Sequence, residues 1–413
     1  MLETFSSRGG APARPVWLHY MKKVLFICSS FPWPPTDGER LRTFNFVREL
    51  AKNTELTIAH PGPTELPDQL ATLFPSSTRW LPYVKRQNDL GTKLSALLSL
   101  TPVFYKMAGS AGLIDWMTSQ KKGTFDVVHL DGLPAFNYYN AALAITPNVV
   151  MDLRDSWSLL YCRLYETNGR KLVQLIKGRL VGTIEAQIVR RCEKLVLISN
   201  IDAQYIENRY PGSSDRIRVI PNGVSEEFLN ILPRASSGDS PAVAFTGAMD
   251  YAPNEQAAFF FAQRVMPLLR QKHPAVRFFI VGKKPSNELR KLANDSVVVT
   301  GEVPSVANYL NDIDIVVAPL LSGAGMKNKV LEALAASRPV VASAIAVEGI
   351  DLTAGKDYLL ADTPEQWAAA IDQLLSNPKQ ASELADNGKN QIRSGYSWLG
   401  AGQAVIDLYE EKP

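Results

Sequence analysis

The sequence predicts an α/β protein with two doubly wound domains. The chain has 413 residues, which is longer than a single hydrophobic core usually grows, so two domains of about 200 residues each are expected. Short apolar, β-rich runs alternate with amphipathic stretches, a pattern typical of buried parallel strands joined by helices. The alternation stops at the polar stretch Leu232–Ser240 and then restarts. Each half is therefore predicted to be a Rossmann-like domain.

These breaks divide the chain into four segments. Residues 1–20 contain no apolar segment of a secretory signal and are predicted to be a tail, because the first apolar run starts just after Met21. Residues 21–235 form the first domain and residues 236–395 the second. Residues 396–413 contain a last helix at Trp398–Glu411 that could pack on either domain, including back on the first.

The first domain is expected to begin with a strand, a loop and a helix. Its predicted strands are Lys22–Ser29, Thr54–His60, Asp126–Leu130, Asn148–Leu153, Lys194–Ser199 and Arg216–Ile220. After the first strand, Leu41, Phe44, Val47 and Leu50 share one helical face behind the N-cap candidate Asp37. This order is the opening of a doubly wound sheet.

The second domain repeats the alternation. Its predicted strands are Ala242–Thr246, Val276–Val281, Ser296–Thr300, Ile313–Ala318 and Pro339–Ala342. Its predicted helices are Asn254–Gln271, Lys327–Ser337, Pro364–Ser376 and Pro378–Ser394. The halves share an architecture without an evident sequence repeat.

Composition excludes several classes of protein. Apolar residues make up 46% of the chain and charged residues 21%, which is typical of a soluble globular protein. The net charge of +3 does not point to nucleic acid. The three isolated cysteines, Cys28, Cys162 and Cys192, suggest neither a disulfide framework nor a zinc site, so a cytoplasmic location is expected. No metal is expected either, because Asp312–Asp314 precedes a strand, at the wrong end of the sheet.

The loop Ser29–Gly38 follows the first strand and ends at a helix start. Backbone N–H groups at a helix N-terminus favour an anion, and Gly38 would allow a ligand to approach closely. A proline-rich turn with an ordinary helix cap explains the same residues. The loop lacks the Gly-x-Gly-x-x-Gly pattern of a dinucleotide site, which argues against an NAD enzyme.

A second loop of this kind lies within Ala318–Lys327, between a strand and a helix. It is rich in small residues and is followed by Lys329 and Glu332, which are three apart and share a helical face. A lysine there can meet a phosphate, and a carboxylate can accept hydrogen bonds from sugar hydroxyls. An ordinary surface Lys–Glu pair is the alternative.

Several motifs together resemble family 4 retaining glycosyltransferases, which have the two-domain GT-B fold. Gly325–Ile350 is similar to the donor-binding core of that family, Val219–Val224 to its interdomain junction, and Phe245–Asp250 to the start of its second domain. Thr246–Tyr251 and Asn328–Glu332 resemble sugar transferases encoded with bacterial exopolysaccharide systems. The resemblance implies two Rossmann-like domains facing each other across a cleft.

The resemblance also implies roles for single residues. Glu332 would hold the donor ribose, Lys329 or Lys327 would neutralise the diphosphate, and strand ends of the second domain would flank the nucleobase. The donor-binding residues implied in this way are Asp37, Gly38, Gly247, Gly282, Val303, Gly323, Gly325, Lys327, Lys329 and Glu332.

Two departures from the family pattern stand out. Ala324 occupies the position of the first of the family's paired glutamates, so that contact to the transferred sugar must be replaced or absent. The usual Arg and Lys are missing from Met249–Asn254, so phosphate neutralisation is expected to depend more heavily on Lys327 and Lys329.

Polar residues at two strand ends of the first domain are the candidates nearest the chemistry. His129 and Asp131 are proposed as catalytic groups, because an aspartate within about 3 Å could accept the acceptor's proton. A strand cap and a turn are the alternative roles. Arg154 and Asp155 resemble the family's acidic motif facing the cleft, and a structural ion pair is equally compatible with Arg154.

The acceptor is least defined. Lys85–Tyr105 and Arg163–Lys194 mix basic and apolar residues, which would suit an anionic membrane and a lipid-linked acceptor; solvated helix faces are the alternative. The resulting prediction is a cytoplasmic glycosyltransferase, at the inner face of the plasma membrane if such contact exists. It would use a UDP- or GDP-sugar, no cofactor, and a glycan or lipid-linked acceptor. A nucleotide-sugar epimerase and a non-catalytic nucleotide-sugar-binding protein are the alternatives.

Overall fold

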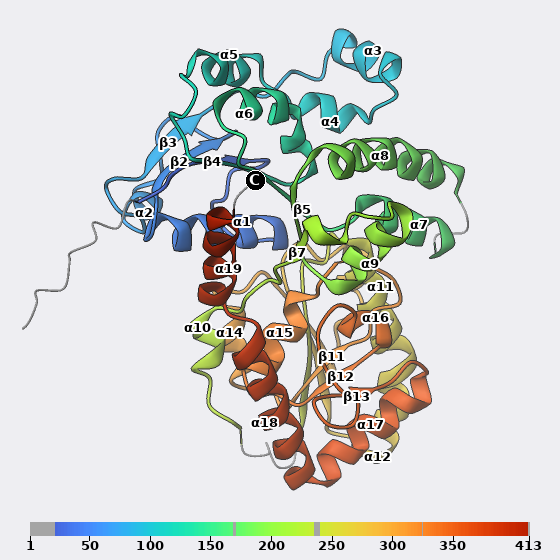
Figure 1. Cartoon of the computed structure of the whole chain (residues 1–413). Helices are drawn as coiled ribbons and strands as arrows, with labels where there is room; N and C mark the ends of the chain where they lie inside the picture. The colour runs from blue at the N-terminus through green and yellow to red at the C-terminus, as the bar shows by residue number, and fades with distance from the viewer. Residues whose placement is uncertain (1–20, 168–170, 235–239, 324, 412–413) are drawn as a thin grey trace, which may run out of the picture.

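The computed structural model describes residues 21–167, 171–234, 240–323 and 325–411 of the chain. The expected tail at residues 1–20 and the departure at Ala324 lie outside these ranges. Two α/β domains stand one above the other in Figure 1, and the C-terminal helix, drawn in dark red, lies beside the first domain. The predicted fold class is confirmed.

The first sheet has seven parallel strands in the order β3-β2-β1-β4-β5-β6-β7. They are β1 (Lys23–Cys28), β2 (Glu55–His60), β3 (Arg79–Pro82), β4 (Val127–Asp131), β5 (Val149–Arg154), β6 (Lys194–Leu197) and β7 (Ile217–Val219). The central strands β4, β5 and β6 are buried along their whole length. Strands buried along their whole length are expected where helices cover both faces of a parallel sheet.

Helices connect the strands of this domain. They are α1 (Gly38–Ala51), α2 (Asp68–Ala71), α3 (Leu90–Leu98), α4 (Val103–Met107), α5 (Ala111–Ser119), η1 (Leu133–Tyr138), α6 (Tyr139–Ile145), α7 (Trp157–Thr167), α8 (Leu172–Arg191), α9 (Asn200–Arg209) and η2 (Ser214–Arg216). The next helix, α10 (Glu226–Leu229), already packs on the second domain, with Phe228 in its core. The predicted cap of α1 is confirmed, because the Asp37 side chain accepts a hydrogen bond from the Arg40 N–H at 3.0 Å.

The second sheet has six parallel strands in the order β10-β9-β8-β11-β12-β13. They are β8 (Ala242–Thr246), β9 (Arg277–Val281), β10 (Val297–Gly301), β11 (Ile315–Ala318), β12 (Val340–Ala342) and β13 (Leu359–Leu360). Its helices are α11 (Ala252–Phe260), η3 (Phe261–Val265), α12 (Met266–Lys272), α13 (Asn287–Arg290), α14 (Val306–Leu310), α15 (Asn328–Ala335), α16 (Ala344–Val347), α17 (Pro364–Ser376) and α18 (Pro378–Gly395). The order is that of a doubly wound sheet.

One predicted helix is interrupted. The sequence predicts a single helix over Asn254–Gln271, whereas the chain changes from α11 to the π-turn η3 and then to α12. Pro267 lies at the start of α12. Because proline has no N–H to donate, it breaks the regular hydrogen-bond ladder, and a π-turn is one of the usual ways to absorb the break.

The chain crosses between the domains twice, and the two crossings touch. The Val224 N–H donates to the Tyr396 carbonyl oxygen at 3.0 Å. A Cβ atom on Gly223 would lie 2.2 Å from the Trp398 nitrogen, so only glycine fits there. Beyond this crossing, α19 (Trp398–Glu410) packs on the first domain, with the Trp398 ring 6.2 Å from that of Phe46.

Candidate active site

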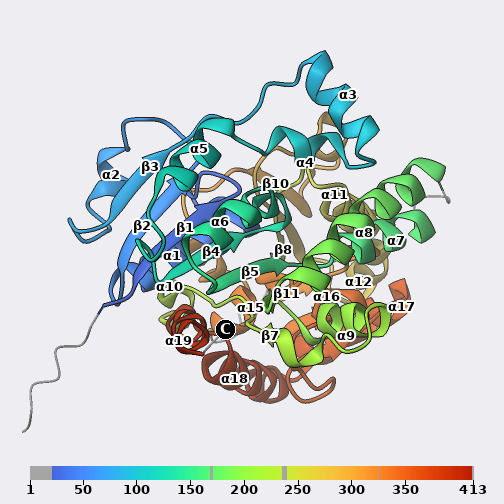
Figure 2. The same cartoon turned by 45° about the horizontal axis from the view of Figure 1, so that its top comes forward.

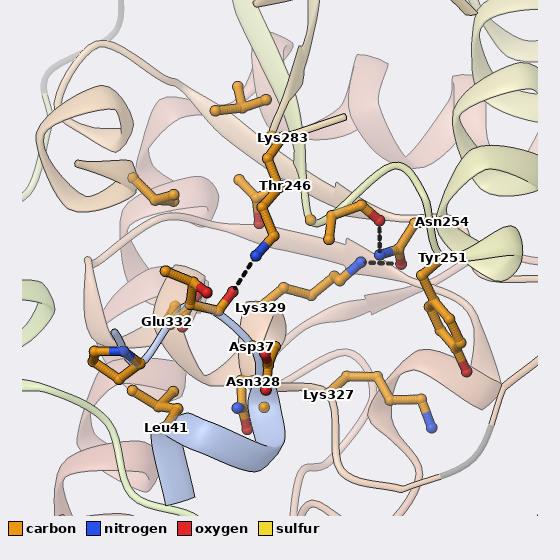
Figure 3. Close-up of a pocket in the computed structure, with 18 of the residues that line it drawn as sticks. Asp37, Leu41, Thr246, Tyr251, Asn254, Lys283, Lys327, Asn328, Lys329 and Glu332 are labelled. Carbon is orange, nitrogen blue, oxygen red and sulfur yellow. Dashed lines mark hydrogen bonds between the residues drawn. The ribbon is translucent and has the colours of Figure 1, made fainter. Parts of the chain in front are cut away.

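A cavity of about 790 Å³ lies between the two domains. It opens where strands of both sheets end, which is where ligands bind in doubly wound proteins. The predicted donor-binding residues that line it are Asp37, Gly38, Gly247, Gly282, Val303, Gly323, Lys327, Lys329 and Glu332. Figure 3 shows the labelled side chains around it, with Asp37 and Leu41 coming from the first domain.

Two glycines of the second domain form the floor of the cavity. Gly247 has a φ of +153° and Gly282 a φ of +152°. A Cβ on Gly282 would lie 1.7 Å from the Gly247 carbonyl oxygen, and a Cβ on Gly247 would lie 2.8 Å from the Lys329 Nζ atom. Larger residues would therefore displace both the backbone and the lysine.

Lys329 is held in a fixed position beneath the cavity. Its Nζ atom donates to the Asn254 Oδ1 atom at 2.6 Å and lies 4.2 Å from the centroid of the Phe245 ring. The Asn254 amide is oriented in turn by donating to the Ala248 carbonyl oxygen at 2.8 Å. Burial lowers the pKa of Lys329 to about 7. An incoming anion would restore the charged form.

Glu332 lies one turn further along α15 and also lines the cavity. Burial raises the pKa of this carboxyl to about 7, and Lys329 acts in the opposite direction. A carboxyl poised near neutral pH in a cavity can accept hydrogen bonds from vicinal hydroxyls once it is ionised. Lys329 and Glu332 thus provide one cationic and one anionic position, one turn apart.

Further cations line the cavity at positions that the sequence analysis did not select. Lys283 and Lys284 follow β9 directly, and the Lys283 Nζ atom donates to the Thr36 carbonyl oxygen of the first domain at 3.1 Å (Figure 3). Lys284 pairs with Asp250 at 3.0 Å. Lys283 and Lys284 thus add two cations to the pair that the sequence analysis selected, and the heavier dependence of phosphate neutralisation on Lys327 and Lys329 stays a prediction. Both added lysines follow a predicted strand, so their place at a strand end could have identified them from the sequence as candidate ligand-binding residues.

Lys327 differs from the other three lysines because it is almost fully buried. Its Nζ atom donates to the Gly325 carbonyl oxygen. Burial lowers its pKa to about 8, an effect that the nearby carboxylate of Glu348 opposes. Gly325 itself lines a small adjoining hollow with Glu348 and not the main cavity.

His129 does not lie where the sequence predicts. The residue is inside β4 and not at its end, has no exposed surface, and stacks on Phe26 with ring centroids 4.5 Å apart. Its Nδ1 atom is 2.9 Å from the Tyr409 hydroxyl of α19. Burial lowers its pKa to about 4. The prediction that His129 reaches the reacting groups is therefore wrong, because α19 covers its side of the sheet.

Asp131 and Arg154 form a buried pair. The Arg154 Nη2 atom lies 2.7 Å from the Asp131 Oδ2 atom, which also accepts from the Thr43 hydroxyl at 2.7 Å. Asp131 has no exposed surface, and neither residue lines the cavity. Glu39 completes the group, 3.1 Å from Arg154. The geometry favours the structural role that the sequence analysis kept as an alternative.

Asp155 lies at the contact between the domains. Burial raises the pKa of this carboxyl to about 6, and among the described residues its Oδ1 atom has no hydrogen-bond partner. Gly325 has a φ of +70°, and a Cβ there would lie 2.7 Å from that same oxygen. Nearby, Arg163 of α7 and Glu348 form two hydrogen bonds of 2.5 and 2.7 Å between the domains.

Comparison with known proteins agrees with this architecture. The family model for group 1 glycosyl transferases matches residues 240–377, and the model for family 4 glycosyltransferases matches residues 36–228. The chain belongs to these glycosyltransferases, and its fold is GT-B. It is 25% identical to a D-inositol 3-phosphate glycosyltransferase of Rhodococcus opacus over 62% of this chain, and the match spans 63% of that relative's length.

Two solved structures share the fold. A sucrose-phosphate synthase from Thermosynechococcus elongatus superposes with a TM-score of 0.69 at 16% identity, covering 94% of this chain and 98% of that one. HepE from Anabaena, in complex with UDP and glucose, gives a TM-score of 0.66 at 14% identity, covering 95% of this chain and all of that one. These similarities concern the arrangement of the two domains.

Within the described ranges, no group of three His, Cys, Asp or Glu side chains is arranged to hold a metal ion. The helices of those ranges include none that is long and apolar enough to cross a membrane.

Proposed function

We propose that this chain transfers a sugar from a nucleoside diphosphate sugar to a hydroxyl acceptor. The observation that carries the proposal is the cavity between the domains, which is large enough for such a donor and is lined by four lysines and by several carboxylates, Glu332 among them. The lysines are Lys283, Lys284, Lys327 and Lys329. The family relationship supports the same reaction class.

In this proposal the donor lies along the second domain. Lys329 and the N-terminus of α15 bind the diphosphate, and Glu332 accepts hydrogen bonds from the ribose hydroxyls. Val303 and Gly282 flank the base. Asp37 and Gly38 approach the phosphates from the N-terminus of α1 across the cleft.

The reaction depends mainly on positioning and charge. Holding donor and acceptor together converts a bimolecular step into one within a complex. As the bond from the sugar to the phosphate breaks, negative charge develops on the departing nucleoside diphosphate, and the lysines and helix N-termini stabilise it. The resemblance to retaining enzymes supports transfer with retention.

A UDP-sugar is the first donor to test, because HepE was solved with UDP and glucose; GDP-sugars remain in the proposal. The acceptor is proposed to be a glycan or lipid-linked hydroxyl in exopolysaccharide or other cell-surface synthesis, at the inner face of the plasma membrane. The resemblance of Thr246–Tyr251 to transferases of such systems supports this context.

The experiment has a binding step and a transfer step. Thermal unfolding is measured with UDP, GDP, ADP and their sugars; a ligand at a hundred times its dissociation constant should add about 2.7 kcal/mol of stability. Release of nucleoside diphosphate and a new glycoside are then followed by mass spectrometry with membrane extracts as acceptor. Stabilisation together with a new glycoside supports transfer.

Other outcomes indicate the alternatives. Binding without turnover indicates a non-catalytic nucleotide-sugar-binding protein, a role consistent with the burial of His129 and Asp131. Isomerised donor indicates an epimerase. Absence of stabilisation by every nucleotide contradicts the proposal.

A further inference from the structure

The short helix α3 presents the wrong face to solvent. In a surface helix the apolar side normally packs against the core. In α3 the inward positions are Thr92 and Ala96, whereas Leu90, Leu97 and Leu98 are 82%, 70% and 77% exposed. The helix is properly capped, since Asp89 accepts a hydrogen bond from the Thr92 N–H at 2.7 Å. The exposed leucines therefore belong to a formed helix.

The apolar surface continues beyond α3. Within α3, Leu94 lies on the same exposed face as the other leucines. After the end of α3, Leu100 and Val103 follow at the turn into α4, and both are exposed as well. The first turn of α8 adds a second group, in which Leu172, Val173 and Ile176 are exposed as well. Later residues of α8, such as Ile184, are buried in the domain. Only the outer end of α8 thus shares this property.

These helices belong to one side of the first domain. Figures 1 and 2 show α3 and α8 projecting from the same side, with α4 next to α3. The Phe104 ring of α4 stacks on the Trp157 ring of α7, with centroids 5.1 Å apart, and α7 packs along α8. We call the exposed apolar residues of α3 and of the start of α8 the leucine surface.

The exposed charges in and beside the helices of the leucine surface are mostly positive, with Asp89 and Glu166 as the acidic residues nearby in the chain. Arg86 and Lys93 are exposed beside α3, and Lys171, Lys177 and Arg179 are exposed at the start of α8. Between residues 171 and 184 the sequence has no acidic residue, and between residues 84 and 107 the only one is the helix cap Asp89. An apolar face bordered by cations matches a bilayer that has an anionic headgroup layer.

We propose that the leucine surface docks this chain on an anionic lipid bilayer, with α3 lying in the plane of the headgroups. The leucines enter the acyl boundary, and the surrounding lysines and arginines meet lipid phosphates. The inference refines the acceptor side of the proposed function, since it assigns residues to the membrane contact. Because donor binding involves the other domain, the two proposals can fail separately.

The test is co-sedimentation of the full chain with vesicles. Wild type is mixed with phosphatidylcholine vesicles that contain or lack phosphatidylglycerol, at low and at high salt. We expect binding to the anionic vesicles only, weakened by salt. The variant Leu94→Glu/Leu97→Glu should lower the partition coefficient at least tenfold, since two exposed leucines proposed to enter the acyl boundary are replaced by anions.

Matched controls distinguish loss of the leucine surface from a change of charge elsewhere or a loss of folding. Leu399→Glu replaces a leucine of α19 that is 69% exposed and lies outside the leucine surface, so it should bind vesicles like wild type. The thermal unfolding midpoint without ligand is measured for each variant, and an unchanged midpoint shows that the double variant is folded whether or not a nucleotide sugar binds.

Three results would overturn the proposal. The first is a wild type that does not bind anionic vesicles, and the second is a double variant that binds them as well as wild type does. The third is a concentration-dependent dimer that the double variant abolishes, because the leucine surface would then be an interface between two copies.

Discussion

The two cavity-lining residues Lys329 and Glu332 should affect the pH dependence of donor binding in opposite directions. Burial lowers the pKa of Lys329 to about 7 and raises that of Glu332 to about 7. A diphosphate favours the ammonium, so binding through Lys329 takes up a proton. Ribose hydroxyls that donate to Glu332 favour the carboxylate, so binding through Glu332 releases one.

The direction in which affinity changes with pH can be stated for each of the two groups separately. The contribution of Lys329 is complete below its pKa in the free protein and falls as the pH rises through it, by up to about tenfold per pH unit. The contribution of Glu332 is complete above its pKa and falls as the pH decreases. The two effects oppose one another in the wild type, so we expect a shallow pH dependence of affinity.

A variant of each residue should reveal the pH dependence of affinity that the other residue causes. In Glu332→Gln the titration of Lys329 is no longer opposed by Glu332, and its pKa falls further because the nearby carboxylate is gone. Lys327, whose pKa is lowered to about 8, loses its charge in the same direction. Affinity should then drop by at least about tenfold between about pH 6 and pH 8. In Lys329→Gln the pKa of Glu332 rises further, and affinity should increase over the same interval.

Isothermal titration with an intact sugar nucleotide measures these slopes. Both phosphates of such a ligand are esterified, so the ligand does not titrate in this interval. Repeating the titration in buffers of different ionisation enthalpy gives the number of protons exchanged. Glu383→Gln, at an exposed position of α18, is the matched control. Slopes of the same sign in both variants, or two flat profiles, would refute the assigned contacts.

Three further perturbations test the structure around the site. Gly282→Ala should lower the free energy of unfolding by roughly 3 kcal/mol, because the new Cβ meets a carbonyl oxygen at 1.7 Å; Gly355→Ala, with a φ of +80° and open space, should lose only about 1–2 kcal/mol in the same urea titration. Asp131→Asn should cost about 3 kcal/mol by the same measurement, because it removes the buried carboxylate that pairs with Arg154 and leaves only the more exposed Glu39. Sugar-nucleotide affinity should stay at the wild-type value, and full stability would contradict the structural role. Lys283→Met should weaken donor binding about tenfold in calorimetry, since a half-buried cation is lost from the cavity, and unchanged affinity would remove that lysine from the site.

Much of the fold could be predicted from local sequence. The strand Ala242–Thr246 and the helix Pro364–Ser376 have the bounds that the sequence predicts. The first is uniformly apolar, and the second begins with a capping box from Thr363. The edge strands β3 and β13 were missed, because each is short and only partly buried and so lacks the apolar signal of a central strand.

The candidate site could be predicted where its residues belong to short motifs at strand ends and helix starts, and not where it depends on contacts between distant segments. One such motif supplies Gly323, Lys327, Lys329 and Glu332, which all line the cavity, whereas Gly325 lines the small adjoining hollow. The contact of Lys329 with Asn254 joins residues that are 75 positions apart in the chain, and no local sequence pattern predicts such a contact. His129 is enclosed by Tyr409, which lies 280 residues away, so its burial could not be read from the strand that contains it.

The central claim is that the cavity between the domains binds a nucleotide sugar. Its most direct test is calorimetric titration of wild type, Glu332→Ala and Glu383→Ala with UDP-, GDP- and ADP-sugars. We predict one binding site per chain for one nucleobase, with affinity lost in Glu332→Ala and kept in Glu383→Ala. Equal affinity in all three proteins, or no binding of any donor, would contradict the account.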